Sequence, residues 1–192
     1  MSEQGTAGTG GERARAGAAS GAPEVPETTE TTALAENSQL PVSSGTIVVG
    51  HDGSIGSKDA LRLAMTLAEK LAVPVVVVRS WSIDRMPRAS NHEFGYVSSF
   101  AEVSATVREQ LLRDVSATVE RHPDVPVECR VAIGQAAVTL VRISEDALML
   151  VVGSRGLGGF SSLMLGSVGD QCVRHATCPV LVDRPRKAQA QR

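Results

Sequence analysis

Two kinds of hydrophobic spacing alternate along residues 45–184. Short runs of β-branched residues predict buried strands, and apolar residues at every third or fourth position predict amphipathic helices. The expected strands cover Thr46–Gly50, Val73–Trp81, Val125–Ile133, Ala147–Val152 and Pro179–Val182. The expected helices cover Ser57–Ala72, Phe100–Val119, Ala136–Ser144 and Ser167–His175, with a polar loop at 82–96. Every strand except the last is therefore followed by a helix.

Strands that alternate with helices predict a parallel sheet, because a right-handed crossover uses the helix to return the chain. We expect a doubly wound α/β fold with five parallel strands in the order 3-2-1-4-5 and helices on both faces. In such sheets a ligand binds outside the carboxyl ends of the strands, at the point where the winding reverses. That point lies between strands one and four, so the segments after Gly50 and Val152 should line one cleft.

The first 44 residues differ in composition from the rest of the chain. They contain no aromatic residue, are rich in Gly, Ala, Thr, Pro and Glu, and carry six acidic and two basic residues. Such a segment buries too little apolar surface to offset its ordering entropy, so we expect a disordered tail at 1–44. It is either a partner-binding arm or a solvated extension. One domain at 45–184 and a polar end at 185–192 complete the expected organisation.

Charge and cysteine content narrow the classes of function. The chain has 19 basic and 21 acidic residues, a balance that gives no attraction to nucleic acid or anionic lipid. No apolar run approaches the ~20 residues that span a bilayer, and no secretory signal is recognisable. Cys129, Cys172 and Cys178 form no CxxC pair, which argues against a zinc site or a disulfide framework. We expect a cytoplasmic protein without a metal site and with neither nucleic-acid nor membrane partners.

Residues 153–168 read GSRGLGGFSSLMLGSV and carry the clearest chemical signal. Glycines such as Gly153 and Gly156 let backbone amides approach an anion, and a helix that begins near Gly166 and Ser167 offers unpaired N–H groups. Arg155 would reach a polyphosphate, and the Ser167 hydroxyl would cap the helix. The segment is therefore either a phosphate-binding loop or a flexible connection between strand and helix.

Two common phosphate motifs do not fit this segment. The GxxxxGK[ST] motif is absent because no Lys lies between Gly153 and Cys178, and GxGxxG fails because Ser161 stands where its third glycine belongs. These absences exclude a P-loop motor and a dinucleotide dehydrogenase. No side chain that could activate water is placed by sequence beside the loop, so we expect no catalytic residue.

The pattern Gly-x-x-Gly, nine residues, Gly-Ser resembles the nucleotide-binding signature of the universal stress protein family. The stretches TIVVGHDGSIGSKDAL, VVVVRSW and VRHATCPVLV are similar to other parts of that family, so the resemblance covers residues 45–184. It implies a homodimeric domain that binds adenine nucleotide, with ATP, with or without Mg²⁺, as the expected cofactor, and that acts in stress adaptation.

The resemblance also implies roles for individual residues. Asp52 would bind the ribose hydroxyls, although an aspartate before glycine also suits an Asx turn. Ser80 would contact the adenine edge through its backbone. The positions around the base and phosphates would be Val152, Gly153, Gly156, Gly166, Ser167 and Val168. Two residues depart from the family: Gly169 replaces a common second hydroxyl residue, and His51 replaces a small apolar residue.

Three functions remain open at this point. The first is a nucleotide-dependent signalling module with slow or no hydrolysis, paired with a second copy through strand 179–182 and acting on an unknown partner protein. The second is a weak ATP hydrolase. The third is a structural dimer that has lost nucleotide binding.

Overall fold

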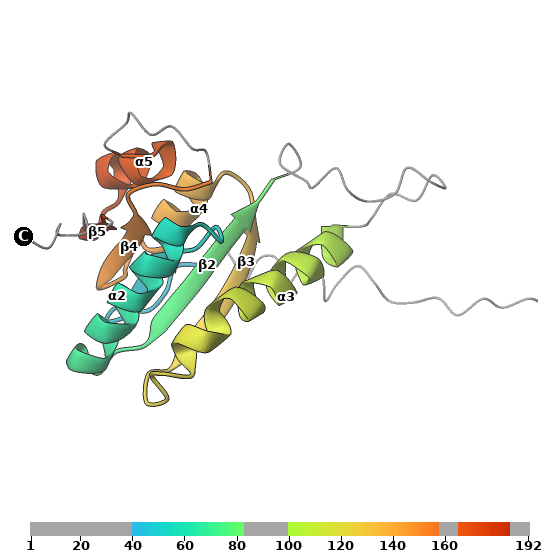
Figure 1. Ribbon diagram of the computed structural model, residues 1–192. Helices are drawn as coiled ribbons and strands as arrows, with labels where there is room; N and C mark the ends of the chain where they lie inside the picture. The colour runs from blue at the N-terminus through green and yellow to red at the C-terminus, as the bar shows by residue number, and fades with distance from the viewer. Residues whose placement is uncertain (1–39, 83–99, 158–164, 185–192) are drawn as a thin grey trace, which may run out of the picture.

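One parallel sheet forms the middle layer of the molecule (Figure 1). The structure, a computed structural model, describes residues 40–82, 100–157 and 165–184. The strands are β1 (Ile47–Gly50), β2 (Val75–Trp81), β3 (Val127–Ile133), β4 (Met149–Gly153) and β5 (Val180–Asp183). They pair in parallel in the order β3-β2-β1-β4-β5, which confirms the predicted topology.

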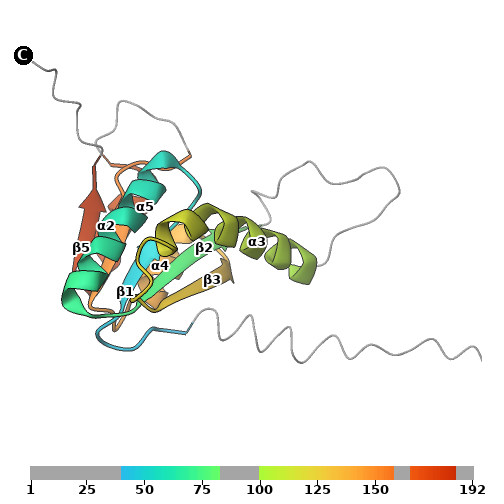
Figure 2. The same cartoon turned by 60° about the horizontal axis from the view of Figure 1, so that its bottom comes forward.

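Helices cover both faces of the sheet (Figure 1). The helices α2 (Ile55–Leu71) and α3 (Phe100–Val119) pack on one face, and α4 (Ala136–Ile143) and α5 (Ser167–His175) pack on the other. Each face therefore has its own apolar core. Figure 2 shows β3 and β5 at the two opposite edges of the sheet.

The helices at 100–119 and 167–175 have the predicted bounds, and the other elements differ from the prediction by one or two residues at one or both ends. The helix α2 begins at Ile55 because Ser54 caps it: its Oγ accepts from the N–H of Ser57 at 3.1 Å. The strand β4 begins at Met149 because Ala147 still belongs to a turn, in which its N–H donates to the carbonyl of Ser144 at 3.1 Å.

The folded body begins before residue 45. Val42 is 4% exposed, packs in the core beneath α4, and donates its N–H to the carbonyl of Ile143 at 2.9 Å. The predicted boundary at residue 45 is therefore too late. Residues 1–39 of the expected tail, the expected loop from residue 83 onwards, and the end at 185–192 lie outside the described residues.

The central strand β1 places the candidate site. Ile47, Val48 and Val49 have no exposed surface, as expected for a strand with helices on both faces. The strand ends at Gly50, so the next residues emerge at the carboxyl edge between β2 and β4. Among the described residues, none of the helices is long and apolar enough to cross a membrane.

Candidate functional site

The carboxylate of Asp52 joins the ends of two neighbouring strands. Its Oδ1 accepts from the N–H of Ser54 at 3.0 Å, which closes a turn directly after β1. Its Oδ2 accepts from the N–H of Leu157, in the glycine segment after β4, at 3.1 Å. The two segments that the sequence places in one cleft therefore meet at this side chain, which is also the Asx-turn residue that its sequence suggests.

Asp52 keeps a negative charge at neutral pH. Burial by itself raises the pKa of its carboxyl group, but hydrogen bonds from Ser54, Leu157 and Ser57 outweigh burial and hold the pKa below its usual value. An ionised carboxylate only accepts hydrogen bonds, and its two oxygens have about four lone-pair sites. It therefore has room to accept from a ligand's hydroxyl groups in addition to its own backbone donors.

Gly156 leaves the space in which the Asp52 carboxylate lies. A Cβ at this position would come within 2.5 Å of Asp52 Oδ2, closer than real Cβ contacts. Any other residue at 156 would displace the carboxylate or the loop. The missing side chain at 156 thus leaves the Asp52 carboxylate free to reach the N–H of Leu157.

The end of β4 also touches the first turn of α2, main chain against main chain. A Cβ on Gly153 would lie 2.7 Å from the carbonyl carbon and oxygen of Gly56. A Cβ on Gly56 would lie 2.6 Å from the carbonyl oxygen of Arg155. Sequence reasoning missed Gly56, because the expected helix begins only at Ser57 and no local signal indicates the contact with Arg155.

The amino-terminal end of α5 faces the same region. Gly166 is its N-cap, with φ −71° and ψ 159°, and no side chain caps this end. Ser167 is the first helical residue, so the prediction that its hydroxyl caps the helix is wrong. The N–H of Gly166 already donates to the carbonyl of Ser154 at 2.8 Å. The N–H groups that have no acceptor within the helix are those of the first turn, from Ser167 onwards.

The other predicted residues make no bond to Asp52 in the described part of the chain. Val152 is buried in β4, and Ser80 is half-buried in β2, two positions beyond the last residue of β2 that pairs with β1. Arg155 is exposed, and Val168 packs partly into the core beneath α4 and α5.

Gly169 is buried where many relatives of the family were expected to carry a hydroxyl. A Cβ there would lie 2.8 Å from Leu165 Cδ1 and 3.7 Å from the carbonyl oxygen of Gly153. The end of the Leu165 side chain therefore occupies the space that a larger residue at 169 would need.

Trp81 is a packing residue at the end of β2. Its side chain is 8% exposed, its ring centroid lies 6.2 Å from that of Phe100, and its Nε1–H donates to Ser104 Oγ at 3.2 Å. These contacts hold α3 against the sheet.

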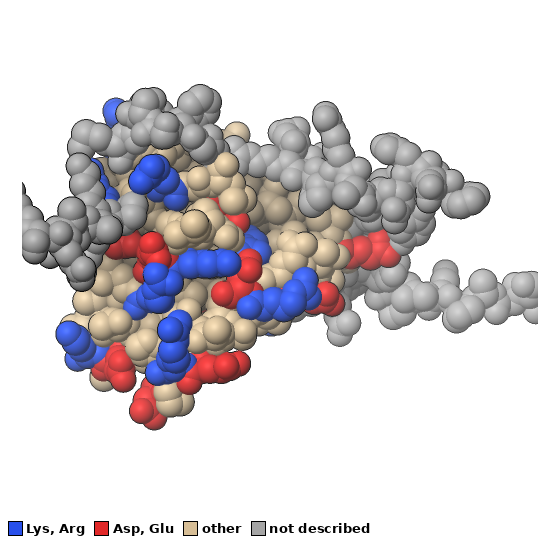
Figure 3. All heavy atoms as spheres, viewed as in Figure 1, with Lys and Arg blue, Asp and Glu red and all other residues tan. Residues whose placement is uncertain are grey.

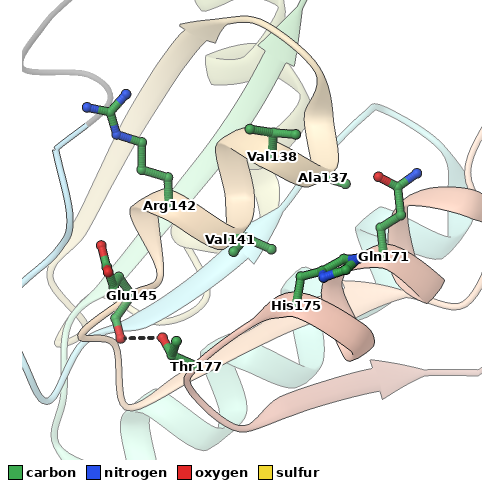
Figure 4. Close-up of a pocket in the computed structure, with 8 residues that line it drawn as sticks. All are labelled: Ala137, Val138, Val141, Arg142, Glu145, Gln171, His175 and Thr177. Carbon is green, nitrogen blue, oxygen red and sulfur yellow. Dashed lines mark hydrogen bonds between the residues drawn. The ribbon is translucent and has the colours of Figure 1, made fainter.

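A hollow of about 350 Å³ lies elsewhere, between α4 and α5 (Figure 4). Ala137, Val138 and Val141 form its apolar wall, and the hydroxyl of Thr177 donates to the carbonyl of Glu145 at 2.9 Å at one end. None of the predicted nucleotide residues lines this hollow. Within the described ranges, no group of three or more His, Cys, Asp or Glu residues could hold a metal ion.

The strand order, the winding reversal at β1 and β4, and the bond from the glycine segment to Asp52 define a doubly wound α/β domain with its candidate site at the switch point. Residues 44–184 match the model of the Universal stress protein family, and the chain belongs to that family. A universal stress protein of Mycolicibacterium smegmatis is 35% identical over 153 residues, which cover 79% of this chain and 48% of the relative. The chain thus spans about half the length of the curated relatives it matches.

Solved structures share the fold. A universal stress protein in complex with cAMP superposes with a TM-score of 0.54 at 22% identity and covers 74% of this chain and 98% of its own. The universal stress protein from Archaeoglobus fulgidus in complex with dAMP gives a TM-score of 0.52 at 22% identity, with 74% and 96% covered.

Proposed function

We propose that this domain binds an adenine nucleotide, with ATP as its ligand, in the cleft between the carboxyl ends of β1 and β4. The observation that carries the proposal is the Asp52 carboxylate, held between the turn after β1 and the N–H of Leu157 in the glycine segment. An ionised carboxylate beside glycine main chain and an uncapped helix end offers acceptors for sugar hydroxyls and donors for phosphates at one place.

In this proposal, different residues contact the ribose, the adenine and the phosphates of the ligand. Asp52 accepts from the ribose hydroxyls, and the backbone of Ser80 at the end of β2 meets the adenine edge. The phosphates, with or without Mg²⁺, lie against the first turn of α5 at Ser167 and Val168, and Arg155 adds positive charge. Because the N–H of Gly166 is already bonded to Ser154, this glycine contributes the space left by its missing side chain.

The ligand class has support from two family structures of the same fold. One is a complex with cAMP and the other a complex with dAMP, both adenine nucleotides. The choice of ATP among adenine nucleotides comes from the resemblance of the Gly-x-x-Gly, nine residues, Gly-Ser pattern.

We further propose that nucleotide is bound with slow or no hydrolysis and that occupancy alters the surface offered to a partner protein or a second copy. His51, the histidine next to Asp52, is unsuited as a base because its ring is buried and its Nδ1 lies 2.8 Å from an Arg79 nitrogen. The cysteines are all free, which suits the reducing cytoplasm. A homodimer through β5 completes the proposal.

The test begins with freshly purified protein, which is heat-denatured and checked for released adenine nucleotide. The nucleotide-free protein is then titrated with ATP by calorimetry; micromolar binding corresponds to about −8 kcal/mol. The Gly156→Glu variant should lose binding, because a side chain and a negative charge would enter the space beside Asp52. The Gln171→Glu variant adds the same charge at an exposed position of α5 and should bind as the wild type does.

Two results would contradict the proposal: a folded wild-type protein that takes up no adenine nucleotide, or undiminished affinity in Gly156→Glu. Single-turnover assays with labelled ATP address hydrolysis separately, and fast Mg²⁺-dependent phosphate release would favour an enzyme.

A further inference from the structure

Arg79 is a buried arginine on β2 that touches the turn carrying Asp52. Arg79 follows Val78, the last residue of β2 that pairs with β1. Its side chain is only 10% exposed. Its Nε–H donates to the backbone carbonyl of His51 at 3.2 Å. That carbonyl belongs to the peptide unit between His51 and Asp52. The backbone pairing of β1 with β2 ends at Gly50 and Val78. Just beyond that point the Arg79 guanidinium bonds the chain after β1 to β2.

The same guanidinium also holds the His51 ring. Nη2 of Arg79 lies 2.8 Å from Nδ1 of His51, and because arginine has only donors, Nδ1 accepts and the proton of the neutral ring is on Nε2. Burial, reinforced by the positive charge of Arg79, lowers the pKa of His51 to about 4, so the ring is neutral at pH 7. Both polar groups of His51 that face Arg79 are thus acceptors of its hydrogen bonds.

A third contact ties this cluster to α3. Nη2 of Arg79 donates to Oδ2 of Asp114 at 2.6 Å, and Lys58 of α2 lies 3.8 Å from the other oxygen of Asp114. Burial raises the pKa of the Asp114 carboxyl, but the hydrogen bond and charge of Arg79 outweigh it and leave the pKa below its usual value. Figure 3 shows this face, on which acidic and basic side chains of α2 and α3 lie interspersed.

The turn at Gly53 leaves room for the side chains of Arg79 and Asp114. Gly53 has a φ of +88°, and a Cβ there would lie 3.4 Å from Asp114 Oδ2 and 3.5 Å from Arg79 Nη2. The guanidinium and the Asp114 carboxylate therefore lie beside Gly53, at ordinary contact distance from the position that a Cβ would take. The turn is thus supported from the α2 and α3 face by this cluster, while Leu157 bonds Asp52 from the glycine segment.

We infer that Arg79 is a positioning residue for the nucleotide site: it fixes the Asp52 turn through His51 and, through Asp114, makes the placement of Asp52 depend on the position of α3. This inference rests on the proposed function, since it gives Arg79 a part in presenting Asp52 to a ribose. A substitution of Arg79 would weaken the binding of the sugar hydroxyls by Asp52, although Arg79 does not contact them.

The test uses the full chain with Arg79→Lys, which keeps the buried charge but lacks the fork that contacts the His51 carbonyl, the His51 ring and Asp114 together. The first measurement, without ligand, is hydrogen exchange at the amides of Ser54 and Leu157, the two donors to Asp52. Both should exchange faster in the variant. The second measurement compares affinities for ATP and 2′,3′-dideoxy-ATP, which lacks the ribose hydroxyls.

The wild type should prefer ATP over the dideoxy analogue, and Arg79→Lys should lose most of that preference. The loss corresponds to about tenfold to a hundredfold in ATP affinity, the range for a hydrogen bond to a charged group. Affinity for the dideoxy analogue should change little. The control is Arg108→Lys: Arg108 also ties α3 to the sheet, through the carbonyl of Cys129 at 2.9 Å, but does not contact the turn.

Asp114→Asn serves as a second variant if Arg79→Lys does not fold, because Asp114 is more exposed and its loss leaves the His51 contacts in place. It should change exchange and discrimination in the same direction by a smaller amount. Unchanged exchange at Ser54 and Leu157 in a folded variant, or an equal loss of affinity for both nucleotides, would overturn the inference. Faster exchange combined with a wild type that binds no nucleotide would instead refute the proposed function alone.

Discussion

Asp52 and His51 are neighbours in sequence with opposite electrostatic requirements. The hydrogen bonds that Asp52 accepts from Ser54 and Leu157 favour its charged form, and the burial of His51 beside Arg79 favours its neutral form. One peptide unit thus separates a stabilised anion from a suppressed cation. The difference follows from the two directions in which consecutive side chains leave the end of the strand.

The buried imidazole predicts a loss of stability in mild acid. The pKa of His51 is 6.5 when unfolded and about 4 when folded, so below pH 6.5 the unfolded chain binds the extra proton and the folded chain does not. His51 should therefore remove roughly 2 kcal/mol from the free energy of unfolding between pH 7 and pH 5. Asp52 and Asp114, whose pKa values are lowered, lose their contribution only at more acid pH.

Urea unfolding at pH 7 and pH 5 measures this effect. His51→Gln keeps an acceptor for Arg79 without the titration and should flatten the pH dependence over that range. The same substitution at the exposed His175 is the control that separates the burial of an imidazole from its mere removal. A His51→Gln variant that loses as much stability as the wild type would show that the decline has another source.

At the scale of elements, the start of α2 serves both the fold and the site. The hydroxyl of Ser54 caps the helix, while the N–H of the same residue donates to Asp52. The first turn of the helix meets the end of β4, at Gly56 and Gly153. The position of α2 along its axis therefore fixes the turn after β1 relative to the glycine segment.

Removing the cap should weaken the helix by a known amount. Ser54→Ala loses the acceptor for the N–H of Ser57 and should lower the free energy of unfolding by about 1 kcal/mol. Thr66→Ala is the matched control: it removes an exposed hydroxyl that donates to the Arg62 carbonyl at 2.9 Å in the middle of the same helix. That change should be neutral or slightly stabilising, because alanine favours helix. Equal losses in the two variants would argue against the cap.

Much of the fold, and part of the site, follows from the sequence alone. Continuous β-branched runs and three-to-four-residue repeats are local signals, so the strand order and the helices were predictable. The glycine segment was predictable because it directly follows a strand. The roles of Arg79 and Gly56 were not, since each depends on a contact with a distant segment, Asp114 and Arg155 respectively. Nothing local in VVVVRSW indicates that its arginine is buried and bonded to Asp114 on α3.

At the scale of the whole molecule, the edge of the sheet at β5 offers a surface on which two copies of the chain could pair. The outer edge of β5 has no partner strand among the described residues, and its apolar residues are only half-buried. The carbonyls of Pro179 and Asp183 accept from the N–H groups of Leu150 in β4 and of Ser154 just after it. The backbone groups of the alternate residues Val180 and Val182 therefore point outward. An apolar open edge of this kind favours pairing with another strand.

The proposed dimer predicts a difference between two substitutions at Val182. Proline removes an outward N–H without touching the ladder to β4, and should convert the dimer to a monomer. Threonine keeps the N–H and a similar shape, and should leave the dimer intact. Sedimentation or light scattering at several concentrations measures the outcome. A dimeric Val182→Pro protein would place the subunit contact on another surface.

The contact between Gly56 and Gly153 has a consequence for anyone who wishes to alter ligand preference. Because hydrogen atoms alone separate these two segments, the distance between them is a property of the backbone and does not respond to the choice of neighbouring side chains. Combinatorial libraries should therefore randomise Ile55 and Leu157, which are 80% and 74% exposed, and leave both glycines untouched. A single added methyl group at either glycine would push the two segments apart. The effect of every other substitution in the library would then be measured on an altered backbone.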